Sequence, residues 1–231
     1  MDISILKKKP ELSTRVVLTI MPLAPLSMVD SMPGSFYQTV QFPTKKMVCG
    51  LFENLLGWHF GKSDRTMILK ELKKNRKKHS LGDTENISSG SSYSPLLMDY
   101  FEIIEEPKIA DMNSLCFYTD YWNRCYRRAD ADVHINGCRN FDIKIINEKN
   151  NLMANGPKES IGPWMKENNG LIPMFYTIPT QREYVDFDGK FKYTIDIDED
   201  LYTSLKDICG VNNICYLGNS EGWVDIKIEK L

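Results

Sequence analysis

Arginine and aromatic side chains alternate in residues 118–128, which read YTDYWNRCYRR. The arginines are Arg124, Arg127 and Arg128. A guanidinium group hydrogen-bonds phosphate through two parallel donors, and an aromatic ring stacks on an unpaired base. The composition therefore favours contact with single-stranded RNA. A half-buried aromatic strand whose arginines extend to solvent would have the same composition, so both interpretations stay open.

Residues 62–78 form a denser basic run. They carry eight basic and two acidic side chains, a net charge of +6 in 17 residues. Such a run makes a local positive field that attracts a polyanion, although a solvated helix face has the same composition. Its candidate RNA contacts are Lys73, Lys74, Arg76, Lys77 and Lys78. Residues 183–200, with a net charge of −5, could instead face a basic neighbour.

A third candidate site is the start of a predicted helix. Thr44 follows a proline and suits the N-cap position, apolar residues then recur at helical spacing, and Gly57 suits the C-terminal stop. A helix N-terminus presents free N–H groups to an anion. Thr44, Lys45 and Lys46 are therefore candidate phosphate contacts.

Motifs for catalysis or metal binding are few. The histidines are His59, His79 and His134. None of them belongs to a recognisable nucleophile, zinc-protease or paired-carboxylate pattern. Asp130, Asp132 and His134 could share one strand face and hold a divalent ion, but nothing supplies a second ligand cluster, so a polar strand face or turn is favoured. We expect no cofactor, no metal and no catalytic residue.

The elements that position these residues are mostly strands. Strands are expected near 15–20, 100–104, 114–119, 141–146, 172–178 and 223–230, and a hairpin over 182–196 is expected to turn at Asp188-Gly189. Helices are expected over 45–56, 64–78 and 198–208. Loops are expected over 21–43 and 79–94. Few helices and many strands indicate an α+β fold with a mostly antiparallel sheet. A ferredoxin-like core with insertions fits this order.

Length and composition bound the class of protein. The 231 residues suffice for one large domain, and the net charge of −2 excludes a uniformly basic nucleic-acid coat. The start lacks the apolar run of a secretory signal, and no stretch approaches the length of a membrane span. Six cysteines without zinc-site spacing indicate buried thiols in a reducing cytoplasm.

Two stretches carry a resemblance to a known family. Residues 20–60 read IMPLAPLSMVDSMPGSFYQTVQFPTKKMVCGLFENLLGWHF, in which a first strand leads through a loop to a Pro-Thr pair and a helix ending in Leu-Gly. Residues 216–221, YLGNSE, form a Leu-Gly-x-Ser-Glu turn before the last strand. In both, the chain resembles the CRISPR-associated Cascade subunit that holds the 5′ end of the guide RNA, the fifth numbered Cas family. It is most similar to type I-B members.

The resemblance implies a single RNA-recognition-like domain over 1–231, with a hairpin or loop "thumb" and a basic, partly mobile insertion around 61–96. It implies a non-catalytic subunit that binds the 5′ handle of crRNA, caps the backbone filament and contributes to antiviral defence. The implied partners are crRNA, the filament subunit, the large subunit and, through the complex, target DNA.

Two alternatives remain. In one subtype the same family resembles a metal-independent endoribonuclease that processes precursor crRNA with Tyr, Lys and His. Tyr37, Lys45 or Lys46, and His59 could supply such a set, although they do not match that motif residue by residue. A plain assembly protein, whose basic run is only a solvated face, is the third reading.

Overall fold

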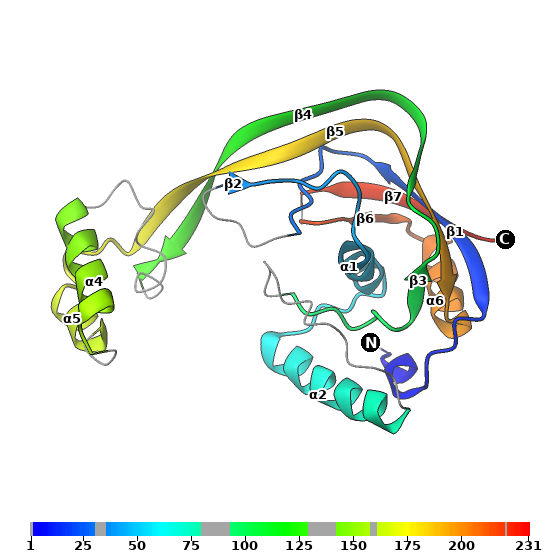
Figure 1. The fold of residues 1–231 in the computed structure, drawn as a ribbon, viewed down its shortest axis with the longest axis horizontal. Helices are drawn as coiled ribbons and strands as arrows, with labels where there is room; N and C mark the ends of the chain where they lie inside the picture. The colour runs from blue at the N-terminus through cyan, green and yellow to red at the C-terminus, as the bar shows by residue number, and fades with distance from the viewer. Residues whose placement is uncertain (1, 31–35, 80–92, 129–141, 158–160, 220) are drawn as a thin grey trace. The chain divides into compact units, whose positions relative to one another are not determined.

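The computed structural model describes residues 2–30, 36–79, 93–128, 142–157, 161–219 and 221–231 (Figure 1). They form two compact units. The first contains Met1–Thr119 and Glu183–Leu231, and the second contains Asp120–Arg182. Whether the two fold as the single domain predicted from the sequence stays a prediction.

In the described part of the chain the strands form one seven-stranded sheet. Its strands are β1 (Thr14–Pro22), β2 (Phe36–Tyr37), β3 (Phe101–Ile103), β4 (Lys108–Arg127), β5 (Phe175–Ile197), β6 (Ile214–Tyr216) and β7 (Trp223–Lys230). The order is β2-β5-β1-β7-β6, and β3 and β4 also pair with β5. β1 is antiparallel to both neighbours, so that Leu18 lies between Tyr193 and Ile228.

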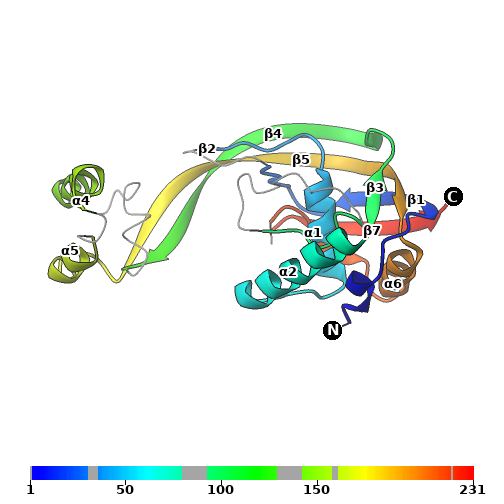
Figure 2. The same ribbon diagram turned by 60° about the horizontal axis from the view of Figure 1, so that its bottom comes forward.

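Helices cover one side of the sheet in the first unit. They are η1 (Ser4–Lys7, a 3-10 turn), α1 (Lys45–Leu55), α2 (Lys62–Lys78) and α6 (Glu199–Cys209). Alternate residues of β1, among them Val16 and Leu18, are fully buried, and Phe52 of α1 and Leu205 of α6 belong to the same core. Figure 2 shows α1 and α6 on the same side of β1 and β7. The period of two in the strand and the apolar stripes of the helices therefore meet in one layered core.

The fold is α+β, as the sequence predicted; the ferredoxin-like detail of the core stays a prediction. β1, β3 and β7 lie where strands were expected, and so do α1, α2 and α6 for the expected helices. Gly57 has φ +68 just after α1, the left-handed conformation expected of a glycine that ends a helix.

The hairpin predicted at Asp188-Gly189 is wrong. β5 runs without interruption through this pair. A Cβ on Gly189 would lie 3.2 Å from the carbonyl oxygen of Ala110 on β4. Asp111, the next residue of β4, has φ +53. The glycine therefore permits close approach of β4 to β5, which is the other common role of glycine in a strand.

The strand predicted at 141–146 is also wrong. Residues 143–146 form the first turn of α4 (Ile143–Asn155), and the carboxylate of Asp142 caps the helix by accepting a hydrogen bond from the N–H of Lys144 at 2.9 Å. Ile146 and Lys149 are the buried residues of this helix. An N-cap and a spacing of three to four residues therefore outweigh the β-propensity of the isoleucines.

The second unit has its own small core. α4 and α5 (Ile161–Glu167) contribute Ile146 and Trp164, which pack with Ile172 and Tyr176. The strand predicted at 172–178 corresponds to the start of β5.

Five cysteines lie among the described residues, and all have free thiols. Cys49 and Cys215 are buried, and burial raises the pKa of Cys215 to about 12. Cys116 and Cys125 are exposed, contrary to the expectation of buried thiols. Cys138 and the 80–92 part of the expected mobile loop lie outside the described residues. Within the described ranges no helix is long and apolar enough to cross a membrane.

Candidate nucleic-acid interface

A cavity of about 710 Å³ lies beside α1 in the first unit. Its wall is built by four stretches: residues 29–30, residues 46–65, Tyr93 and residues 216–219. The two motifs that carry the family resemblance therefore line the same cavity. The side chains that could contact a ligand are Lys46, Asn54, His59, Arg65, Tyr93, Tyr216 and Asn219.

A buried carboxylate organises one wall of the cavity. Glu53, whose side chain is 3% exposed, accepts hydrogen bonds from Nη1 of Arg65 at 2.8 Å and from the hydroxyl of Tyr93 at 2.8 Å. The N–H of Leu96 donates to the same carboxylate at 2.6 Å. These contacts fix Arg65 over the ring of Tyr93, with 5.1 Å between guanidinium carbon and ring centroid.

The same network holds its neighbours in their neutral forms. Burial, with the nearby Glu53 carboxylate, raises the pKa of the Cys49 thiol well above its usual value. Burial also raises the pKa of Tyr93, and Cys49 and Glu53 add to the effect. Neither group supplies a nucleophile or a base near neutral pH, because both stay protonated there.

A tight turn brings the C-terminal motif to the cavity. Oδ1 of Asn219 accepts hydrogen bonds from the N–H groups of Glu221 at 3.1 Å and Gly222 at 2.8 Å. Gly218 has φ +77, and a Cβ there would lie 2.9 Å from the carbonyl oxygen of Ser27. This turn places Tyr216 and Asn219 in the wall.

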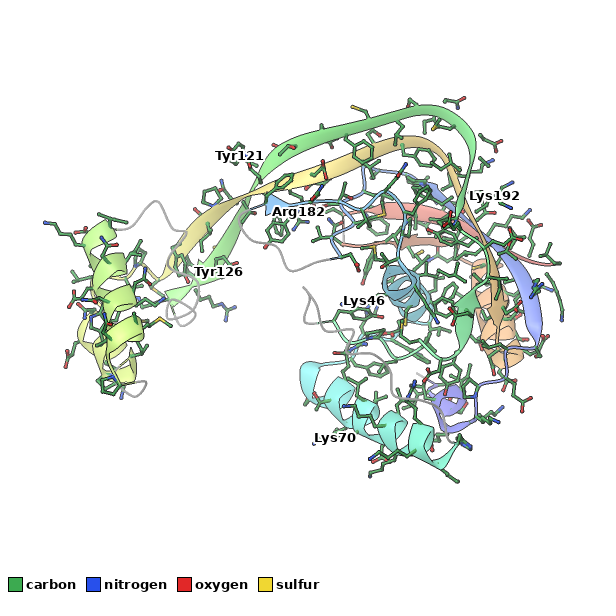
Figure 3. The ribbon with its side chains drawn as sticks, in the orientation of Figure 1. Lys46, Lys70, Tyr121, Tyr126, Arg182 and Lys192 are labelled. Carbon is green, nitrogen blue, oxygen red and sulfur yellow. The ribbon has the colours of Figure 1, made fainter. Side chains whose placement is uncertain are left out.

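The structure separates the two lysines predicted at the start of α1. Lys45 forms an ion pair with Glu102 at 2.6 Å and lies 5.5 Å from the ring centroid of Phe101. Lys46 lies in the cavity wall (Figure 3). Thr44 is the N-cap residue, but its hydroxyl makes no capping hydrogen bond and lies 3.4 Å from a carboxylate oxygen of Asp30.

The basic run forms α2, and two of its five candidate residues are engaged within the chain. Arg76 pairs with Asp99 and is 16% exposed, and Lys74 pairs with Glu71 at 2.6 Å. Lys73, Lys77 and Lys78 are exposed. Their contacts with RNA stay predictions.

Most of the arginine and aromatic stretch, residues 120–128, lies in the second unit, at the end of β4 and just after it. Arg127 is exposed, and Nη1 of Arg128 donates to the side chain of Asn169 at 3.0 Å. Arg124 lies on β4, and its side chain is outside the described part.

Among the described residues of this unit, an arginine that the sequence did not single out lies against an aromatic ring. The guanidinium carbon of Arg182 lies 4.1 Å from the ring centroid of Trp122. Arg182 comes from β5, which runs beside β4 here (Figure 3). Only the β4–β5 pairing brings the two together, so sequence spacing carried no signal for it.

Several acidic residues of 183–200 have partners within the chain, and whether this stretch faces a basic neighbour stays a prediction. Asp196 pairs with Arg15 at 2.7 Å, Asp200 pairs with Lys8, and Glu199 pairs with Lys230 at 3.2 Å. Asp198 caps α6 through the N–H groups of Asp200 and Leu201. Most of this charge is therefore used within the first unit.

The residues of the alternative nuclease set are only partly brought together. Lys46 and His59 line the cavity, whereas Tyr37 lies on β2 and is not among the wall residues. Asp130, Asp132 and His134 lie outside the described residues. Within those residues, no group of three or more His, Cys, Asp or Glu side chains could hold a metal ion.

The charge balance of the cavity indicates what it can bind. Lys46 and Arg65 are matched by Asp30 and Glu53, so the wall has little net charge apart from His59. The remaining wall offers aromatic faces and amide groups. An aromatic, hydrogen-bonding and nearly neutral cavity suits an unstacked nucleotide base better than a bare phosphate.

A comparison with protein-family models identifies the family of this chain. The family model described as CRISPR-associated protein Cas5p matches residues 1–228, nearly the whole chain. A search of curated proteins finds no similar sequence.

Proposed function

Because this chain belongs to the family of CRISPR-associated protein Cas5p, we propose that it is a non-catalytic subunit of a type I Cascade complex. In this proposal it binds the 5′ handle of crRNA, caps the backbone filament beside the large subunit and so contributes to antiviral defence. Type I-B is the subtype that the sequence resembles.

The proposal is supported by one observation: the N-terminal and C-terminal motifs of the family resemblance line the same cavity. Residues 53–60 and 216–219, far apart in sequence, share its wall. Tyr93 and Tyr216 provide ring faces, and Asn54 and Asn219 carry amide groups. A single-stranded handle presents bases that can leave the stack and enter such a cavity.

Removal of a ring from the cavity tests the binding role. Tyr216→Ala should raise the Kd of purified protein for labelled handle RNA by about 5- to 150-fold, the value of one base–aromatic contact. Tyr37→Ala is the matched control, because Tyr37 does not line the cavity. Equal losses in both variants, or none in Tyr216→Ala, would remove the cavity from the RNA path.

Assembly is tested in cells. When the chain is coexpressed with the filament subunit, the large subunit and a repeat array, we expect the purified complex to carry RNA of uniform length. A complex that forms without RNA would support the plain assembly protein instead.

The non-catalytic assignment is tested with repeat-containing RNA and a chelator. We expect binding without cleavage. RNA cleavage by the 2′-hydroxyl requires a base to remove its proton, and a lysine or arginine that binds phosphate does not act as that base. A single discrete cut within the repeat that His59→Ala abolishes would establish the nuclease instead.

A further inference from the structure

We propose that the outer face of α2, together with η1, is a second nucleic-acid surface that binds the phosphate backbone of double-stranded DNA. The surface, here called the lysine face, is separate from the cavity and does not depend on the handle-binding proposal. Its exposed, unpaired cations among the described residues are Lys7 at the end of η1, Lys9 just after it, and Lys70, Lys73, Lys77 and Lys78 on α2.

The amphipathic pattern of α2 directs these lysines outward. Ile68, Leu69 and Leu72 pack against the core of the first unit. Lys70, Lys73 and Lys77 follow a spacing of three and four residues, so they share the opposite side of the helix. Figure 3 shows Lys70 projecting from α2 on the side away from α1.

The two arginines of α2 show that its inner cations are already paired. Arg65 contacts Glu53, and Arg76 contacts Asp99. For Lys70, Lys73 and Lys77 the structure gives no ion pair among the residues it describes. Their charge therefore faces outward, whereas that of the arginines contributes to the fold.

A side-chain amide joins η1 to this surface. Nδ2 of Asn75 donates to the carbonyl oxygens of Leu6 at 3.1 Å and Lys7 at 3.3 Å. These hydrogen bonds hold η1 next to the last turns of α2, and Figure 1 shows the two elements side by side. Lysines from two distant parts of the sequence are thus brought to neighbouring elements. Within the lysine face, Glu71 is paired with Lys74.

The chemistry of the lysine face favours a duplex over a single strand. The α2 sequence KSDRTMILKELKKNRKK contains no aromatic residue, so it offers no ring on which an unpaired base could stack. Lysine acts as a point charge that suits phosphate without reading base edges. Duplex DNA presents one phosphate charge per about 1.7 Å, and a 17-residue helix spans about 25 Å, enough for several contacts.

The test uses the purified full chain and a labelled 30-base-pair DNA of arbitrary sequence. The variant is Lys70→Gln/Lys73→Gln/Lys77→Gln, in which glutamine keeps helix propensity. The matched control, Lys144→Gln/Lys166→Gln/Lys192→Gln, removes the same charge from exposed lysines elsewhere. Circular dichroism and thermal melting confirm that both variants fold like the parent chain.

We expect the lysine-face variant to flatten the plot of log K against log salt by about 2.7, for three lost contacts at about 0.9 each. Its Kd for DNA should rise at least about tenfold at low salt, while that of the control changes little. Its affinity for single-stranded handle RNA should fall by a smaller factor than its affinity for the duplex.

Four outcomes would overturn the proposal. An unchanged salt slope would show that the lysine face is only solvated. An equal loss in the control would show that net charge, not this surface, attracts DNA. A larger loss for handle RNA than for duplex would assign the face to the guide. Duplex RNA of the same length is the final arm, and preference for it over DNA would overturn the choice of DNA alone.

Discussion

Lys45 and Lys46 are neighbours in sequence with different surroundings. The amino group of Lys45 is held by Glu102, whereas Lys46 lies in the cavity wall. The sequence predicts that both lysines contact the same phosphate site, because both lie in the first turn of a helix. Because side chains on consecutive helical positions point about 100° apart, only one of the two could face the cavity.

This difference predicts unequal effects on RNA binding. Lys46→Gln should weaken binding of handle RNA and flatten the salt dependence by about 0.7, the value for one contact with a single strand. Lys45→Gln should leave that slope unchanged and act only on stability. Fluorescence titrations at four salt concentrations measure both. An equal change in slope for the two variants would contradict the separation seen here.

The buried carboxylate of Glu53 makes a stability prediction. Glu53→Ala leaves Arg65 without its buried partner and should lower the free energy of unfolding by about 3–5 kcal/mol. Glu105→Ala is a suitable control, because the Glu105–Lys108 pair is solvent-exposed and such pairs contribute about 0–1 kcal/mol. Urea titrations of both variants give the comparison. A loss below 1 kcal/mol for Glu53→Ala would mean that the wall is not organised by this network.

At the scale of elements, the turn after β6 positions one wall of the cavity. Gly218→Ala forces a Cβ into a left-handed position and to 2.9 Å from a backbone oxygen. Backbone strain and overpacking should together lower stability by about 2–4 kcal/mol. Gly57→Ala has the same backbone cost but nothing within 4 Å of the new Cβ, so it should lose only about 1–2 kcal/mol. Thermal melting that ranks the two variants in the opposite order would contradict this account.

The short elements could be predicted from sequence, because each has its own signals. α1 has a repeating apolar pattern and Gly57, and β1 and β7 are apolar runs with clear ends. β4 and β5 could not be predicted at their full lengths of 20 and 23 residues. Their pairing is long-range, and Asp188-Gly189 carries the composition of a turn within a continuous strand.

The candidate site divides in the same way. Lys46 was predicted from its place on a helix. Arg65 belongs to the basic run, and Tyr216 and Asn219 belong to the C-terminal motif. No sequence pattern marks any of the three as a residue of the cavity wall. The cavity exists because α1 and the turn after β6 are brought together by tertiary packing. No local spacing in the sequence encodes that contact. The two motifs can therefore be recognised from the sequence, but their proximity in the fold cannot be predicted from it.

At the scale of the whole molecule, the two units have separate cores. The residues of one cluster all lie in the first unit, and those of the other, which includes Trp164, all lie in the second. Trp164→Ala should destabilise the second unit by about 3–5 kcal/mol and leave the melting of the first unchanged. Amide hydrogen exchange resolves the two. A uniform loss of protection in both units would show that they unfold as one cooperative domain.

The central position of β1 has a consequence for synthesis of the chain. Val16 pairs with Lys230 on one side and Ile195 on the other. Both partners are translated roughly 200 residues later, which takes about 10–40 s at 5–20 residues per second. During that time the apolar strand β1 has no partner strand on either side. Its unpaired backbone N–H and C=O groups can hydrogen-bond to other chains. We therefore expect a chaperone to shield the nascent chain until β5 and β7 have emerged.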